Sequence, residues 1–395
     1  MKKKTVRDID VDGKRVLVRV DFNVPLDKET RAILDDTRIR AALPTIRYLR
    51  EHRARTVLVS HLGRPDGKVM ESARLAPVAM RLSELLGVPV PCATDVTGPS
   101  ATPLVAAMQA EDVVMLENVR FEPGEEKNDS DLAKKLASFA DVFVNDAFGT
   151  AHRAHASTAG VAKYLPAVAG FLMEKEIDYL GRVVSNPEPP VAAIIGGAKI
   201  SSKIAVLRHL LTKVNTLLIG GGMASTFLKA QGFAVGSSLV EDDQLETARH
   251  IIAEATDRGV TLGLPQDAVI ADRFAANAVS RTAAIADVPA GWMILDVGPK
   301  TIADFEIRLH ETKTVIWNGP LGVAEWEPFA HGSRAMARYL ANLGATVIIG
   351  GGETVAMVTG LGLANRYAHV STGGGASLEF LEGRELPGVA ALLDR

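Results

Sequence analysis

The chain has 395 residues, of which 47% are hydrophobic and 23% are charged, and its formal net charge is −3 at pH 7. This length predicts two or three domains, each long enough to bury its own core. The near balance of charges excludes a protein that binds nucleic acid through an overall basic surface. The single cysteine, Cys92, excludes an intramolecular disulfide framework and a cysteine-based metal cluster.

The N-terminus carries no pattern typical of secretion. Lys2, Lys3 and Lys4 are followed by acidic residues rather than by an apolar stretch. No window of the sequence approaches the ~18 consecutive apolar residues that span a membrane. We therefore expect a cytoplasmic protein, monomeric and without a membrane or nucleic-acid partner.

Short runs rich in β-branched residues alternate with longer helical patterns along the whole chain. The runs are continuously apolar, which is typical of parallel strands covered on both faces. Alternation of this kind predicts βαβ units and an α/β fold in which helices cover mostly parallel sheets. The expected strands are Val16–Val20, Thr56–Ser60, Val113–Leu116, Val142–Val144, Val191–Ile195, Thr216–Ile219, Met293–Val297, Thr314–Trp317 and Thr346–Ile349.

Amphipathic helical patterns lie between these strands. Glu71–Leu86 has apolar residues at three- and four-residue spacing, and Gly87 is expected to end that helix. Another pattern begins at Ile204, where Ser201 or Ser202 is expected to provide the N-terminal cap.

A change in composition near the middle of the chain marks a domain boundary. Ser185–Pro190 is polar and rich in proline, so it fits inside no regular element, and Phe171–Val184 just before it has the pattern of a helix. We therefore predict two similar-sized three-layer lobes joined by a hinge helix. The expected divisions are residues 1–170 for the N-terminal lobe, 171–186 for the connecting helix, 187–380 for the C-terminal lobe and 381–395 for a tail.

In the first half of the chain, basic and short polar residues follow the strands. Ligands of open parallel sheets bind beyond the carboxyl ends of the strands, so these residues are expected to converge. Arginine binds phosphate and carboxylate oxygens through paired hydrogen bonds, and the set fits a small molecule with several negative charges. Taken singly, each arginine is equally explained as a surface residue or half of an ion pair, and the histidines as structural. The residues are Asp21-Phe22-Asn23, Arg38, His61-Leu62-Gly63-Arg64, Arg120, His152-Arg153 and His155.

In the second half of the chain, glycine follows the strands. Glycine lets backbone N–H groups approach phosphate oxygens, and a helix that starts there adds favourable partial charge. One such loop is more often a plain turn, but five of them indicate a nucleotide-sized ligand. Neither G-x-x-x-x-G-K-[ST] nor a strand-linked G-x-G-x-x-G is found, which decides against a P-loop NTPase and a standard dinucleotide site. The loops are Gly196–Lys199, Gly220–Gly222, Asn318–Gly322, Gly350–Thr354 and Gly373–Gly375.

One lobe is thus equipped for a polyanion and the other for a nucleotide, and phosphoryl transfer is the reaction that needs both. Two alternatives remain open. The first is a dehydrogenase with an atypical nucleotide site, although the dinucleotide fingerprint is missing. The second is a non-catalytic relative that only binds a nucleotide or a phosphorylated acid; loss of Arg38 or Lys199 would mark it, and both are present.

Several motifs resemble the phosphoglycerate kinase family, in the order in which that family carries them. The resemblance covers essentially the whole chain, and motifs of this length in this order are highly specific. The motifs are Val18–Leu26 (VRVDFNVPL), Ser60–Pro65 (SHLGRP), Leu116–Phe121 (LENVRF), Asn145–Ser157 (NDAFGTAHRAHAS), Gly196–Lys199 (GGAK), Ile219–Ala224 (IGGGMA), Trp317–Gly322 (WNGPLG) and Val370–Leu378 (VSTGGGASL).

The resemblance implies a two-lobed enzyme that catalyses 1,3-bisphosphoglycerate + ADP ⇌ 3-phosphoglycerate + ATP with Mg²⁺, and a tail that returns to the first lobe. It implies that Arg38, Lys199, Gly351 and Gly374 act in catalysis. The implied phosphoglycerate-binding residues are Asp21, Phe22, Asn23, Arg38, His61, Leu62, Gly63, Arg64, Arg120 and Arg153. The implied nucleotide-binding residues are Lys199, Lys203, Gly220, Gly221, Gly222, Asn318, Pro320, Glu325, Gly351, Gly352, Glu353 and Thr354.

The chain departs from the family at the expected magnesium ligand. The family usually has Gly-Gly-Gly-Asp-Ser where this chain has Gly350–Thr354 (GGGET). Glu353 keeps the charge but adds one methylene, and Mg²⁺ demands near-octahedral geometry at about 2.1 Å. The competing explanation for Glu353 is that a helix N-terminus favours a glutamate through its dipole alone.

Overall fold

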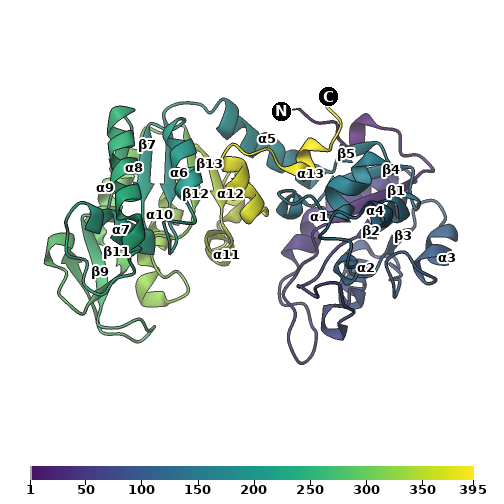
Figure 1. The fold of residues 1–395 in the computed structure, drawn as a ribbon, viewed down its shortest axis with the longest axis horizontal. Helices are drawn as coiled ribbons and strands as arrows, with labels where there is room; N and C mark the ends of the chain where they lie inside the picture. Colours follow the sequence, from purple (N-terminus) through teal and green to yellow (C-terminus); the bar gives the residue numbers. More distant parts are fainter. Residues whose placement is uncertain (1) are drawn as a thin grey trace. The chain divides into compact units, whose positions relative to one another are not determined.

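The structure, a computed structural model, describes residues 2–395 and has the predicted α/β architecture, with helices flanking parallel sheets (Figure 1). The chain forms two compact units. Unit 1 ends at Asp178 and regains Glu385–Arg395, while unit 2 is Tyr179–Arg384. The division falls inside one long helix, α5 (Phe171–Ser185), which matches the expected helix to within one residue.

Unit 1 is built on a five-stranded parallel sheet in the order β3-β2-β1-β4-β5. The strand β1 lies at the centre, where Val16 is paired with Thr56 on one side and with Val142 on the other. Every predicted strand of this half is confirmed to within two residues. The strands are β1 (Arg15–Val20), β2 (Arg55–Val59), β3 (Val113–Met115), β4 (Val142–Asp146) and the unpredicted β5 (Ala167–Ala169).

Helices cover this sheet and bury a core of aliphatic side chains such as Val18, Ile39, Leu58 and Val144. The unit 1 helices are α1 (Thr37–Glu51), α2 (Ala76–Leu86), α3 (Ala101–Ala106), α4 (Ser130–Ala137), the first half of α5 and α13 (Pro387–Ala390).

The expected start of the helix at Glu71 is wrong. Glu71–Ala73 is a separate 3₁₀ turn, and α2 begins only at Ala76. Pro77 accounts for this start, because proline fits the first turn of a helix, where its missing N–H costs nothing, but not the interior. The predicted end is confirmed, since Gly87 adopts a left-handed conformation with φ of 70° just after the last helical residue.

The C-terminal segment is bound to unit 1 by backbone hydrogen bonds. The Lys4 amide donates to the Leu393 carbonyl at 2.8 Å, and the Leu393 amide donates to the Ala167 carbonyl at 2.9 Å. The Gly388 amide donates to the Ala151 carbonyl at 2.8 Å. The tail therefore extends the sheet edge and also touches the loop after β4.

Unit 2 is built on a six-stranded parallel sheet in the order β14-β13-β12-β6-β7-β8. Its core surrounds the fully buried Trp317 of the central strand β12. The strands are β6 (Val191–Ile195), β7 (Thr216–Ile219), β8 (Thr261–Gly263), β12 (Thr314–Asn318), β13 (Thr346–Gly350) and β14 (His369–Val370). The helices are α6 (Ile204–Leu211), α7 (Gly222–Ala230), α8 (Leu245–Asp257), α9 (Pro299–Leu309), α10 (His331–Leu340), α11 (Gly352–Gly360) and α12 (Gly375–Leu381).

One predicted strand belongs to a different sheet from the one expected. Met293–Val297 forms β11, but it pairs antiparallel with β9 (Asp267–Ala271), which also pairs with β10 (Ser280–Ala284). The parallel assignment is therefore wrong for this strand. This separate sheet could not be recognised from the residue pattern, because its outer strand β10 is mostly exposed and carries no apolar run.

The serine cap expected for the helix at Ile204 is also wrong. The residue before α6 is Lys203, and it provides no side-chain cap. Ser201 instead donates to Glu241, with Oγ and Oε1 2.5 Å apart, and Ser202 donates back to the Lys199 carbonyl. Neither Ser201 nor Ser202 is therefore used as the expected cap. Among residues 2–395, no helix is long and apolar enough to cross a membrane.

Asp146, at the end of β4, anchors the start of α5. Its Oδ1 accepts hydrogen bonds from the amides of Leu172 and Met173 at 2.9 and 3.2 Å. A Cβ at Gly170 would lie only 2.2 Å from the same oxygen, so only glycine allows this approach. Burial raises the pKa of Asp146 from its ordinary value of 3.8 to about 6.

This raised pKa predicts a pH-dependent contribution to stability. The folded state binds the proton more tightly than the unfolded chain, so the stabilisation is complete below pH 3.8 and is lost as pH rises through about 6. Asp146→Asn keeps an acceptor oxygen without the ionisable proton. We expect its free energy of unfolding to gain roughly 2–3 kcal/mol relative to the unchanged protein between pH 4 and pH 7. Denaturant unfolding at both pH values measures this, and a pH-independent difference would contradict it.

Candidate active site

The strand ends of unit 1 bring acidic, amide and guanidinium groups together, as predicted. Arg38 lies in the first turn of α1, and its Nη1 donates to both carboxylate oxygens of Asp21 at 3.1 Å and to the Asn23 carbonyl at 3.2 Å. Asn23 Oδ1 accepts the Gly63 amide at 2.9 Å. The loops after β1 and β2 and the start of α1 are thus fixed to one another, and Arg38 stays about 38% exposed.

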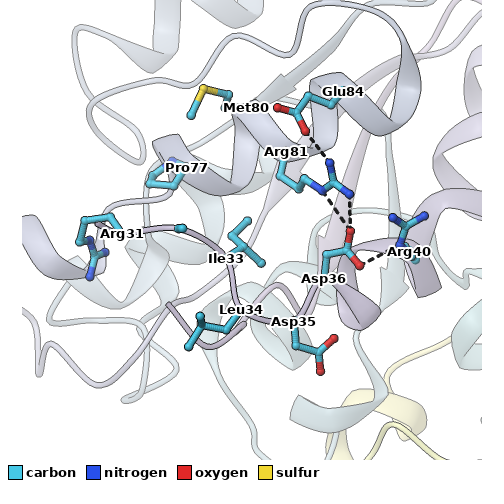
Figure 2. Close-up of a pocket in the computed structure, with 11 residues that line it drawn as sticks. Arg31, Ile33, Leu34, Asp35, Asp36, Arg40, Pro77, Met80, Arg81 and Glu84 are labelled. Atoms are coloured by element: carbon cyan, nitrogen blue, oxygen red, sulfur yellow. Dashed lines mark hydrogen bonds and ion pairs between the residues drawn. The ribbon is translucent and has the colours of Figure 1, made fainter. Parts of the chain in front are cut away.

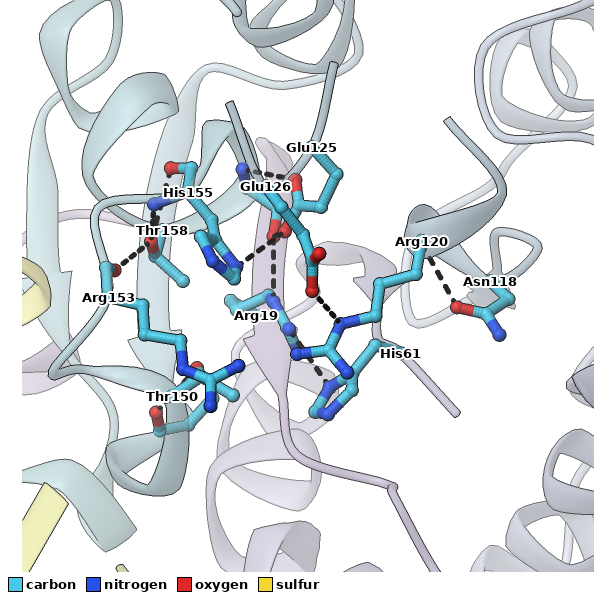
Figure 3. A network of polar contacts seen from close by, with 12 residues as sticks. Arg19, His61, Asn118, Arg120, Glu125, Glu126, Thr150, Arg153, His155 and Thr158 are labelled. Atoms are coloured by element: carbon cyan, nitrogen blue, oxygen red, sulfur yellow. Dashed lines mark hydrogen bonds and ion pairs between the residues drawn. The ribbon is translucent and has the colours of Figure 1, made fainter. Parts of the chain in front are cut away.

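Arg120 is bound to the same group of loops. It lies in the 3₁₀ turn Val119–Phe121, its Nη1 donates to the Gly63 carbonyl at 2.8 Å, and its Nε pairs with Glu126 at 3.1 Å. Burial lowers the pKa of Arg120, and the charges of Arg153 and Arg64 act in the same direction. Arg64, Arg120 and Arg153 are therefore close enough to interact, and Figure 3 shows Arg120 and Arg153 converging beside His61.

His61 is neutral at the centre of this group. Its side chain is almost fully buried, at 4% exposure. Burial lowers the pKa of His61 well below 6.5, and the positive charges of Arg19, Arg120 and Arg38 lower it further. Of these arginines, Arg19 contacts the ring directly, with its Nη2 3.1 Å from His61 Nδ1, and Arg120 and Arg38 are near enough for their charges to act on it.

The other two histidines are placed differently. His155 is buried with Nδ1 3.7 Å from Glu125 Oε1, and burial lowers the pKa of His155 to about 4, as expected of a structural histidine. His152 accepts from Arg153, whose Nε lies 3.1 Å from its Nε2. Arg153 therefore has an orienting partner next to it in the chain.

Two residues assigned to substrate binding turn their side chains into the core. Phe22 is fully buried, and Leu62 is 4% exposed, both within the main hydrophobic cluster of unit 1. The backbone at these positions is also engaged within the protein: the Phe22 amide donates to Ser60 Oγ at 3.0 Å, and the Leu62 carbonyl accepts from Asn118 Nδ2 at 2.7 Å.

Sequence reasoning missed two residues of this region, Arg19 and Glu125. Arg19, the penultimate residue of β1, is 1% exposed, and Glu125 is fully buried. Ser157 lies between them, accepting from Arg19 Nε at 2.8 Å and donating to Glu125 Oε1 at 2.6 Å. A charged residue inside an otherwise apolar strand was the available signal for Arg19. For Glu125, which follows a turn, no signal existed.

The glycine loops of unit 2 pack tightly against one another. A Cβ on Gly196 would lie 2.0 Å from the Pro320 carbonyl oxygen, and one on Gly319 would lie 2.3 Å from the Gly196 oxygen. A Cβ on Gly221 would lie 2.6 Å from the Gly197 amide, and Gly220 is equally crowded by Leu321. These glycines allow three loops to pack with their backbones in contact. The residue pattern predicted ligand binding for all the glycine loops and did not distinguish glycines needed for this packing.

Other glycines face open space. A Cβ would meet nothing within 4 Å at Gly352 or Gly374. Gly351 and Gly374 directly precede α11 and α12, with φ of 84° and 52°. The amide groups that start α11 are thus accessible to an anion, with the positive end of the helix dipole behind them.

Lys203 and Asn318 form the polar centre of unit 2. Lys203 Nζ donates to Asn318 Oδ1 at 2.7 Å. Burial lowers the pKa of Lys203, while the negative charges of Glu353 and Glu382 oppose that shift. Glu353 therefore lies near this lysine. Lys199, by contrast, is exposed.

The remaining predicted nucleotide residues divide into buried and exposed groups. Thr354 is fully buried, and its hydroxyl oxygen accepts the Gly319 amide at 3.0 Å, so it holds the loop after β12. Gly222 opens α7 against Ala198, whose carbonyl oxygen would lie 3.0 Å from a Cβ there. Glu325 is exposed in the loop that follows Gly322.

Glu353 fits a magnesium ion that is bound mainly by phosphate oxygens and water. Its carboxylate is exposed in the first turn of α11, beside the open amides at Gly352. Mg²⁺ commonly uses one or two protein carboxylates and completes its shell with water and substrate phosphates. Among residues 2–395, no cluster of three or more metal-ligating side chains is found, so a protein-only cage is not present there.

A separate hollow of about 550 Å³ lies between the loop before α1 and helix α2 (Figure 2). Its charges neutralise one another: Asp36 accepts from Arg40 Nε and from Arg81 Nη2, each at 2.8 Å, and Arg81 also pairs with Glu84. It therefore offers a polyanion far less than the loops around His61.

The fold and both sets of loops define the class of protein as a two-unit α/β phosphotransferase. A sequence profile described as "Phosphoglycerate kinase" matches residues 6–384. The phosphoglycerate kinase of Pelotomaculum thermopropionicum is 59% identical over 395 residues, covering 100% of both chains. A tobacco protein described as "Phosphoglycerate kinase, cytosolic" is also 59% identical, covering 99% of this chain and 98% of its own.

A solved structure supports the same relationship. The phosphoglycerate kinase from Coxiella burnetii has a TM-score of 0.90 and 42% identity, with 98% of each chain covered. The chain belongs to the phosphoglycerate kinase family. This membership decides against the dehydrogenase alternative.

The same substitution is predicted to be destabilising at a crowded glycine and nearly neutral at an open one. Gly196→Ala places a methyl group 2.0 Å from a backbone oxygen, which no side-chain rotation relieves. We expect it to destabilise unit 2 by about 1–3 kcal/mol, in the range of other overpacking changes. The matched control is Gly352→Ala, whose methyl group meets nothing within 4 Å and should leave stability nearly unchanged. Thermal unfolding of both variants measures the contrast, and equal effects would refute it.

Proposed function

We propose that the protein catalyses the reversible transfer of a phosphoryl group, 1,3-bisphosphoglycerate + ADP ⇌ 3-phosphoglycerate + ATP. Family membership over residues 6–384 supports the reaction. The observation that carries the assignment of substrates is the group of guanidinium side chains around neutral His61 in unit 1, which a phosphorylated carboxylic acid complements.

Unit 1 is the proposed phosphoglycerate-binding unit. Arg64, Arg120 and Arg153 supply paired donors for phosphate oxygens. His61 and Asn23 add neutral hydrogen-bonding groups, and Asp21 supplies an acceptor for a substrate hydroxyl. The backbone at Phe22, Leu62 and Gly63 forms the base of the site rather than a side-chain contact.

Unit 2 is the proposed nucleotide-binding unit. Gly220, Gly221, Gly222 and Pro320 form the packed loops against which the base is expected to lie, and Glu325 is the expected acceptor for ribose hydroxyls. Lys199, Lys203 and Asn318 are assigned to the phosphates, together with the amides at Gly351, Gly352 and Thr354.

Positioning and charge stabilisation account for catalysis in this proposal. An acyl phosphate is already activated, so the β-phosphate oxygen of ADP attacks in line without a general base. Arg38, Lys199 and the amides near Gly351 and Gly374 stabilise negative charge on the transferring group. Arg38 is suited to this role because Asp21 and Asn23 fix its Nη1 while over a third of the side chain stays exposed.

Magnesium is the proposed cofactor, with Glu353 as its protein ligand. When bound, Mg²⁺ neutralises charge on the nucleotide phosphates. Lys203 neutralises the same phosphates from the protein side, and its amine is kept near Glu353 by its hydrogen bond to Asn318.

Binding of the two substrates to different units requires the units to approach one another during the reaction, with exclusion of water from the acyl phosphate. We propose that α5 and its flanks act as the hinge, because the division between the units falls inside this helix. X-ray scattering with both substrates present should show compaction; an unchanged radius of gyration would contradict the hinge.

We further propose a cytoplasmic monomer, for which the cytosolic tobacco relative is the supporting observation on location.

Arg38→Ala tests the proposed function. In a coupled assay for ATP formation, the unchanged protein should turn over, whereas the variant should lose about 10²–10³-fold in kcat, the effect of losing one transition-state donor. Binding of 3-phosphoglycerate should change only a few-fold. The matched control is Arg40→Ala, on the same helix but paired with Asp36, which should retain near-normal turnover. The absence of ATP formation by the unchanged protein would overturn the proposed function, and an active Arg38→Ala would remove Arg38 from catalysis.

The role of Glu353 predicts a change in magnesium dependence. Glu353→Gln removes the charge while keeping the shape, so the Mg²⁺ concentration for half-maximal activity should rise by about tenfold or more. Glu353→Asp keeps the charge and should stay close to the unchanged protein. Titrating Mg²⁺ at fixed ADP measures both, and an unaltered requirement in Glu353→Gln would leave Glu353 as a helix-dipole residue only.

A further inference from the structure

The guanidinium of Arg19 is completely enclosed below the proposed phosphoglycerate site. Arg19 is the penultimate residue of β1, and it is 1% exposed. Its nitrogens are engaged on three sides: Nε donates to Ser157 Oγ at 2.8 Å, Nη1 donates to the Val20 carbonyl, and Nη2 lies 3.1 Å from His61 Nδ1. Arg19 is thus buried below the ring of His61, away from solvent.

The contact between Arg19 and His61 fixes the proton on the imidazole ring. A guanidinium group has five N–H donors and no acceptor, so a hydrogen bond between the two nitrogens exists only if Nδ1 accepts. A neutral ring with an unprotonated Nδ1 carries its proton on Nε2. A doubly protonated ring would place an N–H against an N–H and lose the bond.

The anchorage of Arg19 explains why this geometry is rigid. Ser157 is fully buried; its Oγ accepts a hydrogen bond from Arg19 Nε and donates one to Glu125 Oε1 at 2.6 Å. Its amide donates to Glu125 Oε2 at 2.9 Å. Burial raises the pKa of Glu125, and the positive charge of Arg19 and both Ser157 hydrogen bonds oppose that shift. Figure 3 shows this connected series of polar groups from Glu125 to His61.

The charged groups around His61 act in the same direction. Arg19 comes from β1, Arg38 from α1, Arg120 from the turn after β3, and His155 from the segment after β4. Each of these positive or ionisable groups disfavours an imidazolium at His61, in addition to burial. Geometry and electrostatics therefore select the same neutral state.

We propose that Arg19 is a positioning residue that holds His61 in its neutral Nε2–H tautomer, so that His61 presents a hydrogen-bond donor to an anionic oxygen of phosphoglycerate. The choice of ligand rests on the proposed function, while the tautomer does not. The site then combines charged guanidinium donors with one uncharged donor, whose state does not change between pH 6 and pH 8. Lysine cannot replace Arg19, because the planar guanidinium group reaches Ser157, Val20 and His61 with three separate nitrogens. The single ammonium nitrogen of lysine cannot reach all three.

The test is nitrogen NMR of the ¹⁵N-histidine-labelled full chain without ligand. His61 signals are identified by their loss in His61→Gln. We expect Nε2 of His61 to resonate as a protonated, pyrrole-type nitrogen and Nδ1 as a pyridine-type nitrogen from pH 6 to pH 8. A protonated Nδ1, or a ring that titrates within this range, overturns the proposal. The readout comes from the unchanged protein, and the folded His61→Gln variant serves only to assign its signals.

Arg19→Lys supplies the second arm, with Arg15→Lys on the same face of β1 as its matched control. In Arg19→Lys, His61 should populate both tautomers or titrate at higher pH, and KM for 3-phosphoglycerate should rise about tenfold or more with a smaller change in kcat. Arg15→Lys should change neither the spectrum nor KM. An Arg19→Lys variant with the original tautomer and KM overturns the proposal. If the tautomer is as expected but 3-phosphoglycerate does not bind the unchanged protein, the proposed function fails and the positioning role of Arg19 stands.

Discussion

Several positive charges must be held together in unit 1 before any ligand arrives, and this constraint shapes most of what surrounds them. Like charges repel, and a buried guanidinium without a partner is strongly unfavourable. Each inner cation therefore has its own acidic partner: Arg38 has Asp21, Arg120 has Glu126, and Arg19 reaches Glu125 through Ser157. The partners fix the donors in place and leave enough positive charge unbalanced to attract a polyanion.

The histidine at the centre of this arrangement gains its function from the same constraint. His61 has three arginines around it, and it avoids adding another positive charge by remaining neutral. A neutral imidazole costs less to bury than an imidazolium and still donates one hydrogen bond. The buried network below it thus contributes both to the stability of unit 1 and to the direction of the donor.

For unit 2, the proposed function assigns the binding of negative charge mainly to backbone amides instead of side chains. Its loops approach so closely that only glycine fits at Gly196, Gly221 and Gly319, and the Gly319 amide donates to Thr354 Oγ1 at the start of α11. The open positions Gly352 and Gly374 are where an anion can reach backbone amides. In the proposed function, the closely packed loops and the accessible helix amides together form a preorganised site for phosphate.

Much of the fold was predictable because its strands are buried on both faces and therefore read as continuous apolar runs. Val191–Ile195 and Thr216–Ile219 were placed to the residue for that reason. Met293–Val297 has the same appearance, but it pairs antiparallel with β9 in a separate sheet whose other outer strand, β10, is mostly exposed and carries no apolar run, so its sheet was assigned wrongly.

The site was predictable where residues follow strands, as Asn23, His61 and Arg120 do. It was not predictable where a buried side chain supports the site residues without facing solvent. Arg19 and Glu125 meet only in three dimensions, through a serine 32 residues beyond Glu125 in the chain. The division of the glycines into crowded and open positions likewise depends on loops that are distant in sequence.

The central claim is that each substrate belongs to its own unit, and backbone amide hydrogen exchange tests it most directly. With 3-phosphoglycerate alone, exchange should slow in the loops after β1, β2 and β4, and unit 2 should be little changed. With ADP and Mg²⁺ alone, it should slow at the start of α11 and in the glycine loops of unit 2. Protection of the same unit by both ligands, or of the opposite unit by either, would contradict the account.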